Sequence, residues 1–162
     1  MYRTGHYGVS LLAYAPVGAA MLLAGRPAFA LVGGAIVLGL ARVPDYDHQV
    51  PFIQHRGPTH TLVFALLVGA VVGAVGFYGA PSLGLDPQQL GAFGLAMGTY
   101  GIVAHLLGDV LTPAGVPLFW PLSSRTYSFY VTRADNTVAN WALLGLGVFV
   151  TIVTAVLVAR VA

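Results

Sequence analysis

Residues 62–80 read LVFALLVGAVVGAVGFYGA, a run without a single charged side chain. A helix needs about 20 apolar residues to cross the roughly 30 Å hydrocarbon core of a bilayer, so this run is long enough to span a membrane. The whole chain agrees, because 57% of its 162 residues are hydrophobic and only 7% are charged. Such a composition lies outside the range of ordinary soluble domains. We therefore expect an integral membrane protein.

Four further apolar stretches are separated by polar or Pro/Gly-rich breaks, at residues 7–24, 27–40, 90–111 and 138–159. The first resembles a secretory signal, but another apolar stretch follows at once and we expect a retained helix. The second is short, because only fifteen uncharged residues separate Arg26 from Arg42. A re-entrant hairpin formed by these two stretches is the alternative to two full spans. The pattern predicts an all-α fold: a multi-pass transmembrane helical bundle of about five spans, forming a single domain over residues 1–162.

Glycines recur at helical spacing in the apolar stretches, as Gly69 with Gly73 and Gly94 with Gly98. Small residues let helix backbones approach closely in lipid, where no water drives apolar side chains together. We expect these glycines to serve helix packing and the bundle to be compact.

The arginines predict the orientation of the chain in the membrane. With five spans, one side carries the N-terminus and two long loops, and its arginines are Arg3, Arg42, Arg56, Arg125 and Arg133. The opposite side has Arg26 and Arg160. The positive-inside rule therefore places the N-terminus and both long loops in the cytoplasm, with the protein in the inner, or plasma, membrane.

Directly before the first quoted run, residues 45–60 read DYDHQVPFIQHRGPTH. This segment holds two of the five aspartates and three of the five histidines in a chain that has no Glu, Lys or Cys. Without thiolates, any metal must be held by His and Asp. Imidazole and carboxylate are the ligands that zinc prefers, and they also suit manganese and iron. The segment therefore predicts a divalent-metal site, with zinc the first expectation.

The predicted topology brings other polar residues to the same layer. His105 and Asp109 stand four residues apart on one helix face, and His6 opens the first span with Ser10 and Tyr14 below it as a polar stripe. All histidines and every aspartate except Asp86 fall in this layer. The expected metal ligands, for one or two ions, are His6, Asp45, His48, His60, His105 and Asp109.

Simpler interpretations exist for each motif taken alone. His105 and Asp109 can form a hydrogen-bonded pair at a helix end, and residues 45–48 can form a solvated turn. Thr59 is placed to cap the helix that begins near Thr61, which would leave His60 as an interfacial side chain. The shared layer favours the metal site over these separate explanations.

Three motifs carry a resemblance to a known family: PDYDH at 44–48, HRGPTH at 55–60, and HLLGD at 105–109 continuing through Thr112, Gly115 and Pro117. His6 with Gly8 adds an N-terminal histidine motif. The chain resembles membrane-bound proteins classed as metal-dependent hydrolases and described in bacteria as inner-membrane, LexA-binding-type proteins. That family often has Ser where this chain has Thr61. The resemblance implies a multi-pass helical protein with a hydrolytic divalent-metal centre, and it implies no particular substrate.

The residues themselves suit hydrolysis. A divalent ion held by His and carboxylate can lower the pKa of bound water and polarise the scissile bond. We expect Asp47, His55 and Arg56 to be catalytic, because a surplus Asp or His can act as acid or base and a guanidinium suits a phosphate. Arg125 and Arg133 are expected substrate residues, with anchoring to lipid headgroups as the alternative. Aromatic residues between 113 and 137 can form either an interfacial belt or a lid over a lipid cleft.

The leading hypothesis is a membrane-embedded hydrolase that acts on a phosphoester of a lipid or lipid-linked substrate. A metal-ion transporter or channel is the first alternative, although the third and fifth spans have no ionisable residue in their interiors. A structural or regulatory protein whose metal only staples loops is the second. The weak and scattered positive charge argues against nucleic-acid binding, and the sequence leaves the oligomeric state open.

Overall fold

A computed structural model describes residues 1–52 and 55–161 of the chain. The long helices are α1 (Arg3–Leu23), α2 (Pro27–Leu40), α3 (Leu62–Gly79), α4 (Pro87–Val110) and α5 (Thr137–Val161). Short 3-10 helices are η1 (Pro44–Gln49), η2 (Pro58–His60) and η3 (Ala80–Leu83). Within the described residues no strand forms, and the only β pairing is an isolated bridge between Val116 and Tyr127. The structure confirms the predicted all-α, multi-pass helical bundle, because five segments are long and apolar enough to span a membrane.

The second span acquires its length from residues beyond α2. The helix itself has 14 residues and begins with Pro27, whose fixed φ suits the first helical position. The chain then continues through a turn at 41–43 into η1, so that the segment Pro27–Gln49 has 23 residues. The second span therefore reaches its full length only when η1 is included. Asp45 and Asp47, which belong to η1, lie at one end of the bundle as a result.

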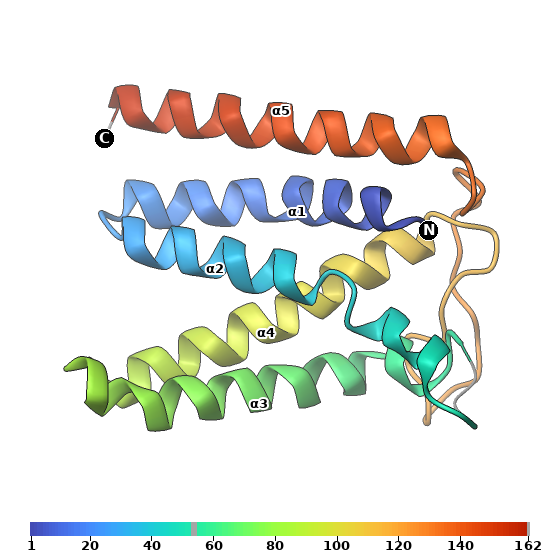
Figure 1. The fold of residues 1–162 in the computed structure, drawn as a ribbon, viewed down its shortest axis with the longest axis horizontal. Helices are drawn as coiled ribbons and strands as arrows, with labels where there is room; N and C mark the ends of the chain where they lie inside the picture. Colours follow the sequence, from blue (N-terminus) through green and yellow to red (C-terminus); the bar gives the residue numbers. More distant parts are fainter. Residues whose placement is uncertain (53–54, 162) are drawn as a thin grey trace.

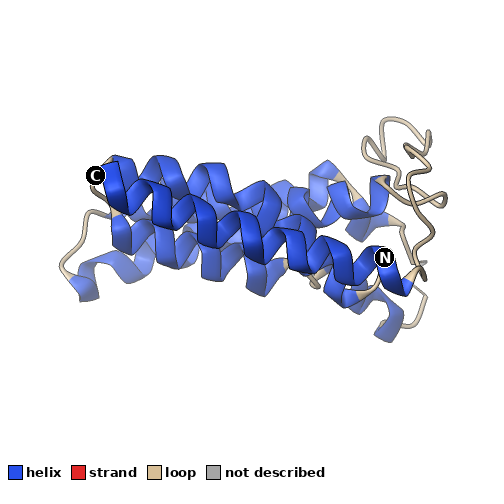
Figure 2. Cartoon of the chain, turned by 90° about the horizontal axis from the view of Figure 1, so that it is seen from above, coloured by secondary structure: helices blue, strands red, loops and turns tan. Residues whose placement is uncertain are grey.

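The order of the helices across the bundle differs from their order in the chain. α1 lies between α5 and α2, and α4 packs along α3 before its last turns pass behind the end of α2 toward the start of α1 (Figure 1). Seen from above, the bundle is elongated and its loops gather mainly at one end (Figure 2). α1, α2 and α4 form the interior, while α5 and α3 flank it and present most of their apolar surface outward.

Glycine contacts hold α3 against α4, as their spacing predicts. A Cβ added at Gly98 would lie 2.9 Å from the Cα of Gly69, and one added at Gly94 would lie 2.6 Å from the carbonyl oxygen of Val72. A larger residue at either position would push the two backbones apart. Close packing of this pair matters for the site because it fixes the direction of α4. The direction of α4 sets the position of its last turns, which carry His105 and Asp109.

One end of the bundle collects the polar segments. The N-terminus of α1, the helices η1 and η2, and the connection at 111–136 lie together there, while the α3–α4 connection and the C-terminus lie at the other end (Figure 1). The structure thus places the N-terminus and both long loops at the same end of the bundle, as a chain with five spans requires. Which compartment this end faces stays a prediction from the arginine count.

Candidate metal centre

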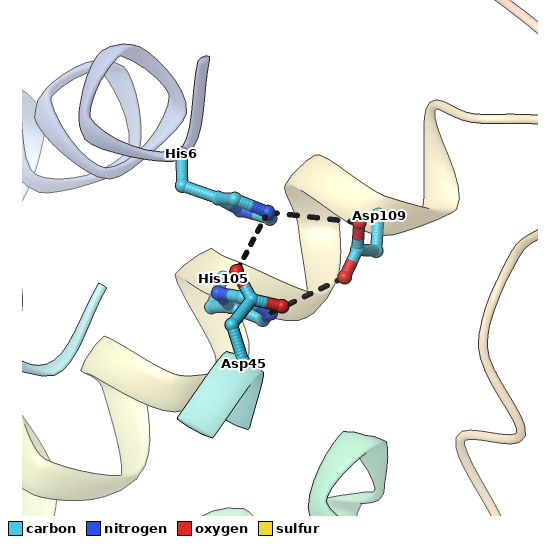
Figure 3. A group of neighbouring side chains, drawn as sticks. All are labelled: His6, Asp45, His105 and Asp109. Atoms are coloured by element: carbon cyan, nitrogen blue, oxygen red, sulfur yellow. Dashed lines mark ion pairs between the residues drawn. The ribbon is translucent and has the colours of Figure 1, made fainter. Parts of the chain in front are cut away.

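Five of the six expected ligands converge at the polar end of the bundle. They come from four elements: His6 from the first turns of α1, Asp45 from η1, His60 from η2, and His105 with Asp109 from the last turns of α4. Figure 3 shows His6, Asp45, His105 and Asp109 pointing toward one another. One ligand atom of each of these four lies within 4.8 Å of the others. We call His6, Asp45, His60, His105 and Asp109 the ligand cluster.

The distances within the cluster suit coordination of a cation. Nε2 of His105 and Nε2 of His60 lie 3.2 and 3.4 Å from Oδ2 of Asp109. The same two nitrogens lie 3.7 and 3.5 Å from Oδ1 of Asp45, and 3.3 Å from each other. Ligands around a tetrahedral ion with bonds of about 2.0–2.1 Å are separated by about 3.3–3.4 Å. These distances are those expected for ligands of one small divalent ion. The side chains concerned are Asp45, His60, His105 and Asp109.

Burial gives a second indication of a cation. The side chains of His6, His60, His105 and Asp109 are fully buried. Within the described part of the chain, Oδ2 of Asp109 has no hydrogen-bond partner, although two imidazole nitrogens lie close to it. A buried carboxylate oxygen without a partner is costly. A divalent ion among these atoms would satisfy it, so the residues present fit a metal.

The backbone orients His105 for this role. Its Nδ1 lies 2.8 Å from the carbonyl oxygen of Ala41. A carbonyl can only accept, so Nδ1 donates, and Nε2 is the nitrogen left to face the cluster as a ligand. The His105 ring also stacks on that of His6, with centroids 3.9 Å apart and planes 7° from parallel. Gly108 leaves room for His6, because a Cβ there would lie 2.9 Å from its Nδ1.

Asp47 lies behind the cluster and organises the loop at 55–60. Its Oδ1 lies 2.9 Å from Nδ1 of His55, while its Oδ2 accepts from the hydroxyl of Thr59 at 2.8 Å and from the backbone N–H of Arg56 at 3.3 Å. Nδ1 of His60 lies 3.4 Å from the same Oδ2. One buried carboxylate thus holds two imidazoles by their Nδ1 sides. These contacts suit an orienting role for Asp47, and its expected catalytic role stays a prediction.

His48 and His55 lie at the rim of the cluster. His48 is exposed and stacks on His55 with ring centroids 3.6 Å apart. A ligand atom of His55 lies within 4.8 Å of ligand atoms in Asp45 and His60. His55 therefore borders the cluster, whereas His48, predicted as a ligand, lies outside the buried set.

Arg56 joins the cluster to the connection at 111–136. Its Nη2 donates to Oδ1 of Asp109 at 2.8 Å, and its Nη1 donates to the hydroxyl of Thr112 at 2.9 Å and to the carbonyl of Gly115 at 3.2 Å. Arg56 and His55 also line a cavity of about 610 Å³, together with Trp120 and Thr126. The guanidinium therefore contacts the ligand cluster while facing open space.

The two arginines expected to bind substrate lie away from the cluster. Arg125 is exposed and stacks over the ring of Tyr127 at 5.3 Å. Arg133 is 80% exposed and forms an ion pair with Asp135 at 3.0 Å. This pairing lowers the pKa of Asp135 and raises that of Arg133. The structure brings neither arginine to the predicted metal ligands.

The sequence reasoning also placed the cap of α3 at the wrong threonine, and it missed Asn140. The cap of α3 is Thr61, whose hydroxyl accepts from the N–H of Phe64 at 3.1 Å, and Thr59 is freed to bind Asp47. Asn140 in α5 was missed. It is buried, accepts from the N–H of Tyr2 at 3.0 Å and so fixes the start of α1, near His6, against α5. Asn136 and Asn140, four residues apart at a helix start, were the available signal.

The electrostatics of His60 reflect its two carboxylate neighbours. Burial by itself lowers the pKa of His60, but Asp109 and Asp45 outweigh it and hold that pKa above the usual value for histidine. A proton and a metal ion therefore compete for this nitrogen.

Five spanning helices that enclose a buried His/Asp cluster at one end define a multi-pass membrane protein with a candidate metal centre. Comparison with known proteins identifies the family: the chain belongs to the YdjM inner membrane protein family, which it matches over residues 1–162. These relatives and the five apolar helices together assign the chain to the inner membrane.

Curated relatives include the inner membrane protein YdjM of Escherichia coli (strain K12) and that of Shigella flexneri. Each is 34% identical to this chain over 100 residues, which cover 51% of this chain and 46% of the relative. The match thus spans about half the length of these relatives. No solved structure matches the chain.

Proposed function

We propose that this protein is a membrane-embedded, divalent-metal-dependent hydrolase that acts on a phosphoester of a lipid or lipid-linked substrate. The observation that carries this proposal is the position of Arg56, which contacts the Asp109 carboxylate of the ligand cluster and also lines the adjoining 610 Å³ cavity. A substrate in this cavity would meet Arg56 and His55, and Arg56 in turn contacts Asp109 of the ligand cluster. Zinc fits the donor set best, and manganese or iron would use the same ligands.

The ligand cluster supports the metal part of the proposal. A divalent ion bound there would supply Lewis acidity and an activated water. The side chains of Asp45, Asp109, His60 and His105 would hold it, and Asp47 keeps the loop imidazoles in place. Because these ligands come from three separate elements, η1, η2 and α4, metal binding would also tie η1 and η2 to α4.

His55 is the residue best placed to move a proton. Its Nδ1 faces Asp47 at 2.9 Å, and the ring borders both the cluster and the cavity. An imidazole held by a carboxylate on one nitrogen can take up or release a proton at the other. We assign His55 the role of general acid or base.

Arg56 suits a phosphate group in the cavity. Asp109, Thr112 and Gly115 engage some of its donors and fix the plane of the guanidinium. Within the described residues the remaining donors form no hydrogen bond, and a fixed planar fork is better suited to phosphate oxygens than a flexible ammonium. The negative charge that develops during phosphoryl displacement would then be stabilised beside the metal site.

The location favours a substrate at the membrane surface. The cluster lies at the ends of spanning helices, where headgroups are found, and the nearby connection exposes Phe129 and Tyr130, each 73% accessible. Aromatic side chains of this kind settle at the membrane interface. The arginine distribution predicts that this end is cytoplasmic, so we propose that the enzyme works from the cytoplasmic face.

The test is hydrolysis by protein purified in detergent, supplied with phospholipids and with generic phosphoesters, with and without a chelator. We expect turnover that a chelator abolishes and that added divalent metal restores. Arg56→Lys should reduce turnover by more than about tenfold, because hydrogen bonds to charged groups contribute about 1.5–3 kcal/mol, while leaving bound metal nearly unchanged. Arg133→Lys is the matched control and should keep full turnover.

Absence of metal-restorable turnover on every phosphoester and ester, together with metal-ion flux into protein-containing liposomes, would replace the hydrolase by a transporter. Bound metal with neither turnover nor flux would favour a structural role.

A further inference from the structure

We propose that the ligand cluster holds two divalent ions bridged by the carboxylates of Asp45 and Asp109, with His60 and His105 on one ion and His6 on the other. The inference rests on the metal-binding part of the proposed function and specifies how many ions bind and through which atoms. It does not depend on hydrolysis.

The two carboxylates divide their oxygens between the histidines. Oδ1 of Asp45 and Oδ2 of Asp109 are the oxygens near His60 and His105. The opposite oxygens are near His6, whose Nε2 lies 3.7 Å from Oδ2 of Asp45 and 3.6 Å from Oδ1 of Asp109. Each carboxylate therefore faces two positions at once, with one oxygen toward each (Figure 3).

The number of donor atoms also favours two ions. The cluster presents three imidazole Nε2 atoms and four carboxylate oxygens, while a tetrahedral ion takes four ligands. A single ion among His60, His105 and one oxygen of each carboxylate would leave the His6 side unused. Two ions sharing both carboxylates would use every donor, and paired ions about 3.5–4 Å apart are a common arrangement in hydrolytic enzymes.

Positive groups already gather at the second position. The amino group of Met1 donates to Oδ1 of Asp109 at 2.7 Å and lies 3.2 Å from Nε2 of His6. The guanidinium of Arg56 approaches the same oxygen at 2.8 Å. These two groups balance the charge on the Oδ1 side of Asp109, and an ion bound between this oxygen and His6 would take the place of the Met1 amino group.

The two positions differ in their access to solvent. The first is formed by two fully buried imidazoles and two carboxylates, which complete a tetrahedral set. The second has one imidazole, and it borders a cavity of about 440 Å³ lined by Met1, Asp45 and Arg56. We infer that the first ion is enclosed by protein ligands, while the second keeps open coordination positions toward this cavity.

The test counts ions and measures their coupling. Chelator-treated protein in detergent is titrated with Mn²⁺, desalted, and analysed for metal by mass spectrometry and for spin coupling by electron paramagnetic resonance. We expect about two ions per chain, as in paired-ion sites, with the exchange-coupled spectrum that bridging carboxylates produce. His6→Gln should leave one ion with an uncoupled spectrum, and so should His105→Gln. Asp135→Asn, at an exposed carboxylate paired with Arg133, is the control and should keep the coupled pair.

One ion per chain in the unmodified protein would overturn the inference, and so would two ions without coupling. Both results come from the unmodified protein, so the inference is decided even where a variant fails to fold. A coupled pair in a protein that hydrolyses nothing would uphold the inference and defeat the proposed function. Metal-dependent hydrolysis with a single ion would do the reverse.

Discussion

Helix α4 carries an aspartate at each end, and the two have opposite surroundings. Asp86 is exposed and caps the start of the helix, accepting from the N–H of Gln89 at 2.6 Å. Asp109 is fully buried in the last turn. A negative charge is favoured at a helix start and disfavoured near its end. Asp86 is therefore explained by helix stability alone, whereas Asp109 requires compensation from outside the helix.

The compensation that Asp109 receives identifies the functional end of the molecule. Arg56, the Met1 amino group and three imidazoles surround its carboxylate, and one oxygen still lacks a hydrogen bond among the described residues. A buried charge in a membrane segment that helix stability does not explain is expected to serve a function. The comparison teaches that the position of an aspartate, and not its mere presence in an apolar chain, separates the candidate site from the structural end.

The strongest test of the difference between the two ends is topological, because the expected result is all or none. The chain has no cysteine, so single substitutions report one position each. Ser124→Cys, in the connection beside the cluster, should resist an impermeant thiol reagent in intact cells. Ser82→Cys, in η3 at the opposite end, should react. The reverse pattern would place the candidate site outside the cytoplasm.

The next largest effect is expected from removing each aspartate of α4. Asp109→Ala should weaken metal binding by more than about 100-fold. Loss of a residue that only orients a ligand costs up to about 100-fold in metal affinity, and loss of a direct ligand should cost more. Asp86→Ala should leave metal binding unchanged and cost about 1 kcal/mol of stability through the lost cap. Metal analysis and thermal unfolding in detergent, with and without chelator, check both. Equal metal content in the two variants would reduce Asp109 to a structural residue.

A smaller effect is expected at Asp47, which touches the imidazoles by their outer nitrogens. Asp47→Asn should lower metal affinity by about 10–100-fold, as loss of an orienting partner does. Asp135→Asn, an exposed carboxylate in the same layer, should change affinity little. Competition with a fluorescent chelator measures both. A loss at Asp47 as large as that at Asp109 would make Asp47 a direct ligand.

The smallest expected effect concerns how stability depends on pH. The direction of this dependence should differ between the metal-free and the metal-bound protein. In metal-free protein the raised pKa of His60 means that its protonated form adds stability at low pH, which is lost as the pH rises through that pKa. Metal requires the neutral ring, so the metal's contribution to stability is lost as the pH falls. Unfolding temperatures between about pH 8 and 6 should therefore shift in opposite directions with and without metal. Parallel shifts would exclude His60 as a ligand.

The sequence by itself determined the spans, because hydrophobicity is summed along about 20 consecutive residues and needs no knowledge of neighbours. It predicted the apolar stretch at 62–80 to within one residue of α3, and it placed His6, Ser10 and Tyr14 on the inner face of α1, where all three are buried. His105 and Asp109 followed from helical spacing alone. These inferences hold because helical geometry is local and regular.

Only the tertiary structure decided what the loops do. It moved the cap of α3 from Thr59 to Thr61, brought Asp47 behind two imidazoles and left Arg125 and Arg133 outside the site. It also turned one oxygen of Asp45 and one of Asp109 toward His6, and the other oxygen of each toward His60 and His105. Such contacts join residues far apart in the chain and depend on backbone conformations that have no sequence period. A sequence can therefore assemble the ligand types in one layer, but the folded chain sets which atoms meet.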